Sequence, residues 1–159
     1  MANRIVDRPK QKIISGYKWR WDGFHRGLDL RSWTDPIEGQ ARKRLDVMLP
    51  CDCEFVRKTN QKKWGWTLVF RPFNSIAEEI KFTHITDKNF VTDKVYQKGF
   101  VIGQSCMTDH MIKLSKKGKV GEHIHFETWR YKKNKLTGLK KLVHFNPIEF
   151  LKEQGVDYD

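Results

Sequence analysis

Long apolar runs are missing from this chain of 159 residues. Nowhere do eighteen apolar residues follow one another, and the first ten residues contain no apolar stretch of the length that a signal peptide needs. The sequence therefore predicts neither a membrane span nor an export signal.

Cysteine is scarce, and its odd number excludes a complete disulfide framework. Cys51, Cys53 and Cys106 suit a reducing site of synthesis. A single residue separates Cys51 from Cys53, whereas metal-binding pairs usually have at least two between them. We therefore predict buried or semi-buried free thiols rather than a metal site.

Acidic residues are few compared with basic ones. The chain has 31 Lys and Arg against 19 Asp and Glu, a net charge of +12. Such an excess attracts polyanions, and nucleic acid, acidic membrane surfaces and anionic cell-wall polymers all remain candidates, as does a merely solvated basic surface. We find no zinc-finger spacing, aromatic RNA-binding motif or lone basic helix, so nucleic-acid binding is not expected.

Low-complexity tracts and internal repeats are absent too, and 38% hydrophobic residues with 13% aromatics predict a folded chain. The length fits one domain. Residues 1–12 are polar and basic, so we expect a flexible arm there, followed by a single domain over residues 13–159.

Alternating apolar and polar residues predict a mainly β protein. The predicted strands cover residues 45–48, 54–57, 66–70, 80–84 and 123–129. One helix is expected near the end, over residues 148–154, where Asn146 can cap and Pro147 suits the first helical position. A shorter helix is possible over residues 86–90 or 87–90.

Histidines and one aspartate recur in two short motifs. Side chains two apart in a strand share a face, so His123 and His125 should project into one pocket. His25 and Asp29 are four apart, which also returns both to one side, and Gly27 between them leaves room for the backbone to bend.

Imidazole and carboxylate groups are zinc ligands, and three of them leave a fourth position open for an activated water. The two motifs, with His84 between them, therefore predict a mononuclear zinc site with catalytic histidines. His110 and His144 are expected to be surface residues. Trp66 is expected in the core, whereas core packing and sugar stacking remain equal alternatives for Trp19 and Trp21.

The flanks of these motifs resemble the lysostaphin-type, or LytM-like, zinc metallopeptidases, which cut peptide bonds in bacterial peptidoglycan. The resemblance extends over residues 13–151, and its strongest part is Gly121–Glu127. The other matching stretches are Ile14–Tyr17 with Arg20, Phe24–Leu30, Val47–Pro50 ahead of Glu54–Val56, Phe82–Ile85, Lys98–Gly103 and Asn146–Leu151.

The resemblance implies an antiparallel β-sheet core, long loops that form a groove, and a short C-terminal helix. It also implies that His25, Asp29 and His125 bind zinc, while His123 and His84 line the reaction pocket. His123 is placed to take the proton of the bound water and His84 to stabilise the oxyanion, although both roles need only an imidazole near the same water.

The expected activity is zinc-dependent endopeptidase cleavage of a cross-bridge or stem peptide in peptidoglycan. The missing export signal favours a phage lytic or virion-associated enzyme, made in the cytoplasm of an infected bacterium and acting on the wall or carried on the virion, where other virion proteins are candidate partners. The alternative is a catalytically silent binding module of a phage tail. Residues 104–120 exceed the family's usual compact turn, and we expect this loop to border the cleft.

Overall fold

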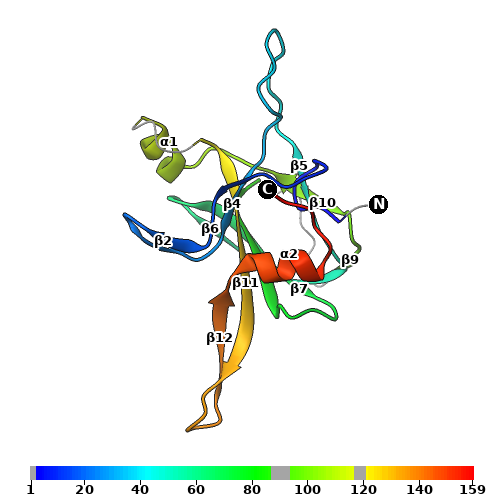
Figure 1. Cartoon of the computed structure of the whole chain (residues 1–159), viewed down its shortest axis with the longest axis vertical. Coiled ribbons are helices and arrows are strands. Elements are labelled where there is room, and N and C mark those ends of the chain that lie inside the picture. The colour runs from blue at the N-terminus through cyan, green and yellow to red at the C-terminus, as the bar shows by residue number, and fades with distance from the viewer. Residues whose placement is uncertain (1–2, 87–93, 117–120) are drawn as a thin grey trace.

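An antiparallel β-sheet dominates the computed structural model, which describes residues 3–86, 94–116 and 121–159 (Figure 1). The elements in chain order are β1 (Ile13–Ser15), β2 (Lys18–Arg20), β3 (Gly23–His25), β4 (Leu28–Arg31), β5 (Asp46–Met48), β6 (Cys53–Gln61), β7 (Gly65–Pro72), β8 (Glu79–Ile85), β9 (Val95–Tyr96), β10 (Val101–Gln104), α1 (Asp109–Lys116), β11 (His123–Lys133), β12 (Lys140–Phe145) and α2 (Pro147–Glu153).

The main sheet has eight strands in the order β1-β4-β11-β8-β7-β6-β9, and β12 pairs with β11 outside that path. Two small two-stranded sheets, β10-β5 and β2-β3, lie beside it. Every pairing between these strands is antiparallel. The mainly β prediction is therefore confirmed, and each predicted strand overlaps an observed one.

Alternation along the central strands places the core on one face of the sheet. Phe82 of β8 and Phe126 of β11 are fully buried, with ring centroids 5.2 Å apart. Helix α2 packs on this layer through Phe150, whose ring centroid is 5.8 Å from that of Phe126. The predicted cap is confirmed, because the Asn146 side chain accepts a hydrogen bond from the Ile148 backbone N–H.

The flexible arm predicted for residues 1–12 is wrong over the described part, residues 3–12. Ile5 and Val6 are fully buried, and Val6 forms a β-bridge with Val47. Gln11 is buried as well, and its amide makes hydrogen bonds in both directions with the Val6 backbone. Ile5 and Val6 anchor this polar segment on the core, because burial of their apolar side chains stabilises the packed position.

The long segment over residues 104–120 is not all loop, because it contains α1. Only Met111 is fully buried among the α1 side chains that the structure describes, so the apolar periodicity of a helix is weak there. The short helix expected near residues 86–90 falls mostly outside the described residues. Cys51 and Cys53 are buried free thiols, as predicted.

No helix within the described ranges is both long and apolar enough to cross a membrane.

Candidate metal centre

Strand register brings the two sequence motifs together. In the pairing of β4 with β11, Asp29 lies directly opposite His125. On the other edge of β11, His125 lies opposite Thr83 of β8. His25 ends β3, three residues before β4 begins. The structure thus gathers residues that are about one hundred positions apart.

Three potential ligand atoms converge at this point. The Nε2 atom of His25, the Oδ1 atom of Asp29 and the Nδ1 atom of His125 are 2.9 to 3.1 Å apart. These three residues form the one group of His, Cys, Asp or Glu side chains among the described residues that could hold a metal ion.

Hydrogen bonds on the far side of each ring fix which nitrogen carries the proton. The Nδ1–H group of His25 donates to the Gly16 carbonyl at 2.6 Å. The Nε2–H group of His125 donates to the Glu127 carboxylate at 2.9 Å. In the neutral rings, the inner nitrogens are therefore bare acceptors that face Asp29. Three acceptors directed at one point repel one another unless a cation lies between them, so this donor set fits zinc.

His123 and His84 are held in the same way. The Nδ1–H group of His123 donates to the Gly121 carbonyl and that of His84 to the Trp64 carbonyl, both at 2.8 Å. The two rings stand edge to face, with centroids 5.1 Å apart. The Nε2 atom of His123 is 3.4 Å from Oδ1 of Asp29.

His84 enters the pocket through a local irregularity in β8. The pairing with β7 jumps from Thr83 to Ile85, so His84 is an extra, unpaired residue with φ of +66°. A regular strand would direct His84 away from the face that carries Thr83 and His125. The bulge changes that direction, as bulges near functional sites commonly do.

Charges in the pocket compensate one another. Burial would raise the pKa of Asp29, but its close contacts with His123, His125 and His25 hold that pKa far below its usual range. Burial opposes a charge on His125, yet hydrogen bonds to Asp29 and Glu127 outweigh that cost and raise its pKa to about 9. Burial would raise the pKa of Glu127 as well, but its hydrogen bond with His125 outweighs burial and lowers that pKa to about 2. Without metal, a proton on His125 supplies the positive charge.

The pKa of His84 moves in the opposite direction, to about 3, because burial and the nearby His123 both disfavour a charged ring. His84 is therefore a neutral imidazole at ordinary pH.

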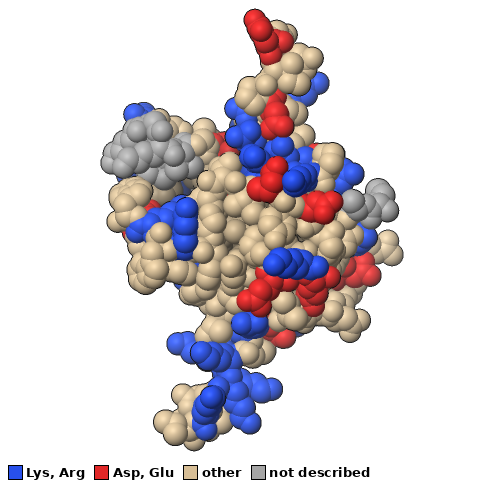
Figure 2. Space-filling view, in the orientation of Figure 1, with Lys and Arg blue, Asp and Glu red and all other residues tan. Residues whose placement is uncertain are grey.

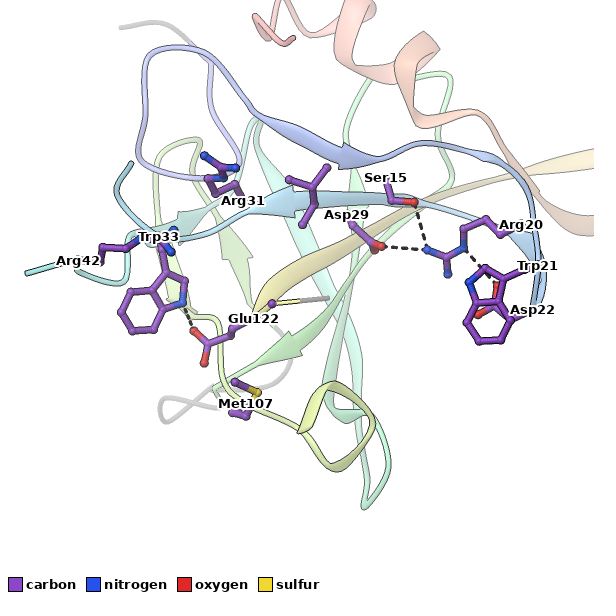
Figure 3. Close-up of a pocket in the computed structure, with 12 residues that line it drawn as sticks. Ser15, Arg20, Trp21, Asp22, Asp29, Arg31, Trp33, Arg42, Met107 and Glu122 are labelled. Carbon is purple, nitrogen blue, oxygen red and sulfur yellow. Dashed lines mark hydrogen bonds and ion pairs between the residues drawn. The ribbon is translucent and has the colours of Figure 1, made fainter. Parts of the chain in front are cut away.

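Asp29 lines two hollows in the surface. On the histidine side is a cavity of about 510 Å³, whose walls include Trp64, Lys81 and Trp129. On the other side is a hollow of about 770 Å³, lined by Trp21, Trp33 and Arg31 among others (Figure 3). Arg20, Asp22 and Asp29 line both hollows.

Arg20 lies at the junction of the two hollows. Its guanidinium donates to the second Asp29 oxygen at 3.4 Å and to the Ser15 hydroxyl at 3.1 Å (Figure 3). This arrangement leaves Oδ1 of Asp29 directed at the histidines.

Sequence reasoning gave Glu127 no role, although the signal was present. Glu127 and Trp129 are two and four residues beyond His125, and this spacing places all three on one strand face. The Trp129 indole N–H donates to the second Glu127 oxygen at 2.7 Å. Glu127 is thus fixed from one side while it orients His125 on the other.

The remaining singled-out side chains are not ligands. His110 of α1 borders the cavity and contacts Trp64, with ring centroids 4.3 Å apart. His144 forms a hydrogen bond of 2.8 Å with the Tyr17 hydroxyl. Trp66 is partly buried against the core, as expected.

Trp19 and Trp21, for which the sequence gave no preference, are 77% and 73% exposed and do not belong to the core.

No protein-family model matches the sequence, and a search of curated proteins finds no match. Solved structures do match. The catalytic domain of the antimicrobial peptidase lysostaphin from Staphylococcus simulans has a TM-score of 0.58 at 17% identity, over 87% of this chain and 90% of that domain.

A zinc-containing peptidase from Vibrio cholerae gives a TM-score of 0.56 at 18% identity, over 90% of this chain but 38% of its own length. A SpoIIIAH–SpoIIQ complex gives 0.61 at 15% identity, over 94% and 99%. At such identities the likeness concerns the fold, which is of the lysostaphin type.

Proposed function

We propose that this chain is a zinc-dependent endopeptidase that cleaves peptide bonds in bacterial peptidoglycan, within a cross-bridge or a stem peptide. The observation that carries the proposal is the convergence of three bare acceptor atoms, from His25, Asp29 and His125, beside the imidazoles of His123 and His84. Lysostaphin and the Vibrio protein, both of this fold, are described as peptidases.

His25, Asp29 and His125 would hold the metal. Bound zinc supplies a Lewis acid for the scissile carbonyl and lowers the pKa of a water toward neutrality. The protein contributes orientation: Arg20 restrains one oxygen of Asp29, and Glu127 keeps the Nε2 proton on His125. The ligand side chains are therefore already in the orientation and tautomer that metal binding needs, which lowers the entropic cost of binding zinc.

His123 is the better placed proton acceptor. Its Nε2 atom is bare in the neutral ring and lies beside Asp29, whereas burial makes the ring of His84 a poor base. The Trp64 carbonyl holds the Nδ1 proton of His84, so this ring can donate to an oxyanion only after its Nε2 atom gains a proton. Oxyanion stabilisation by His84 would thus require a further proton from solvent on Nε2, because the proton of the attacking water goes to His123.

The net charge of +12 favours retention on anionic cell walls. Action as a phage lytic or virion-associated enzyme in an infected bacterium, with other virion proteins as partners, stays a prediction.

Digestion of purified peptidoglycan tests the proposal. The zinc-loaded chain should release new amino termini, identified by mass spectrometry, and a chelator should stop the release until zinc is restored. His25→Ala should lose zinc and activity together, whereas His123→Ala should keep one zinc and lose activity. A zinc-loaded chain that cleaves no peptidoglycan from a range of bacteria would refute the proposed activity.

A binding module is the second candidate, because the SpoIIIAH–SpoIIQ structure includes a chain of this fold in a complex with another protein. That function predicts one bound zinc without turnover. It is excluded if cleavage depends on His123.

A further inference from the structure

The β11–β12 hairpin projects from the end of the molecule opposite the loop over residues 32–45 (Figure 1). Its residues 130–141 are all exposed. No acidic residue occurs between Thr128 and Ile148, whereas the hairpin carries Arg130 and five lysines: Lys132, Lys133, Lys135, Lys140 and Lys141. Figure 2 shows this basic cluster as a continuous blue region around the hairpin.

The lysines are held close to one another rather than neutralised. Lys132 lies directly opposite Lys141, and Lys133 lies opposite Lys140. Like charges in facing positions destabilise a two-stranded ribbon. Arg130 pairs with Glu149, but none of the five lysines forms an ion pair with a carboxylate in the described parts of the chain. An external anionic surface would relieve this repulsion.

Two leucines occupy the tip beyond the lysines. Leu136 is 96% exposed and Leu139 is 71% exposed, the first being the most exposed large apolar side chain among the described residues. Tyr131 follows along the hairpin at 53% exposure. Apolar side chains ahead of a basic ring match the order of an anionic bilayer, with acyl chains inside and charged headgroups outside.

The tip has a compact, internally bonded backbone. The Asn134 side chain accepts hydrogen bonds from the backbone N–H groups of Leu136 and Thr137. The Asn134 backbone bonds to both Gly138 and Leu139. Entry into an apolar phase is costly when backbone groups are left without partners, and the N–H groups of Asn134 and of residues 136–139 already have them.

From these observations we propose that the β11–β12 hairpin binds the surface of anionic phospholipid membranes, with Leu136 and Leu139 inserted at the acyl boundary. Lysines alone would suit any polyanion, but a nucleic acid or a wall polymer offers no apolar layer for the two leucines. The hairpin continues the strand that bears His125, and eight residues of β-strand place its tip roughly 26 Å from the metal centre. Membrane binding would therefore hold the cleft near, but outside, the bilayer.

Co-sedimentation of the full chain with vesicles tests the inference. The chain should bind vesicles of mixed phosphatidylglycerol and phosphatidylcholine, and hardly bind phosphatidylcholine alone. Leu136→Ser with Leu139→Ser should weaken partitioning at least about tenfold, because burial of the two side chains is lost. Lys133→Glu with Lys140→Glu should weaken it by a similar factor or more, since each lysine near an anionic surface contributes about fivefold.

Ile37→Ser with Lys43→Glu supplies the matched control, because both residues are exposed on the loop at the opposite end. This variant should bind like the parent chain. Failure to bind the anionic vesicles overturns the inference. Unchanged binding by the leucine variant also overturns it, in favour of charge-only recognition of an anionic polymer. His25→Ala should bind vesicles normally, so loss of the proposed peptidase activity leaves this test intact.

Discussion

Gly27 has almost no space for a side chain, so Gly27→Ala tests the geometry of the metal centre directly. A Cβ atom there would lie 2.4 Å from the Phe126 carbonyl oxygen and 2.9 Å from Cε1 and Nε2 of His125. Real Cβ contacts essentially never fall below 3.0 Å. Phe126 and His125 belong to β11, which is paired on both edges by β4 and β8, so the strand cannot move aside easily.

The substitution should act on both stability and zinc binding. Overpacking of this kind costs about 1–3 kcal/mol. In a protein of this size each kcal/mol corresponds to about 2–4 °C, so Tm should decrease by about 2–12 °C. The added methyl also displaces the ring atom of His125 that donates to Glu127, and loss of such support typically lowers metal affinity about 10–100-fold. Scanning calorimetry and zinc competition with a chromophoric chelator measure the two effects.

Gly16→Ala is the matched control. No atom lies within 4 Å of a Cβ built at Gly16, and its carbonyl would still accept the hydrogen bond from His25. If Gly27→Ala matched Gly16→Ala in both Tm and zinc affinity, the packing of this turn against His125 would be refuted.

Three further predictions concern the pocket. Glu127→Ala should lower zinc affinity about 10–100-fold, while Glu127→Gln keeps an acceptor for His125 and most of the affinity; equal losses in chelator competition would contradict the orienting role. His84→Ala and His123→Ala should each reduce peptidoglycan cleavage by about two orders of magnitude at unchanged zinc content, and full activity would remove that residue from the mechanism. In zinc-free protein, the raised pKa of His125 gives stability that is complete below pH 6.5 and lost as pH rises to about 9, roughly 3 kcal/mol. After chelation, Tm should therefore fall as the pH rises through that window. In the zinc-loaded protein His125 stays deprotonated, so its titration should not change Tm there. A Tm that stays constant over the window after chelation would contradict the stabilising role of the His125 proton.

Short-range sequence patterns predicted much of the fold. Alternation along residues 123–129 predicted both a strand and a shared face for His123 and His125, and the cap at Asn146 predicted α2. The two buried residues Ile5 and Val6 show where such patterns fail, because two apolar positions are too few to reveal a period. Helix α1 was missed for the same reason, since its apolar face is narrow.

The candidate site was likewise predictable only where local patterns specify it. The sequence named His25, Asp29, His84, His123 and His125 from motif and resemblance, and strand periodicity contained the unused signal for Glu127. The bulge at His84 could not be predicted from the residue types. Apolar and polar residues alternate in the same way up to Phe82 whether β8 is regular or bulged. Only the pairing with β7 decides which face His84 occupies.

The sequence by itself determined which residues could alternate, cap and ligate, since these properties depend on neighbours a few positions away. Tertiary structure decided that Asp29 faces His125 across β4 and β11, that Arg20 restrains Asp29, and that the lysines of the hairpin face one another. Such contacts join distant segments, and their register follows from burying one continuous apolar layer. A local pattern cannot specify that register, because one-residue shifts and alternative strand neighbours satisfy the same alternation until the whole core is assembled.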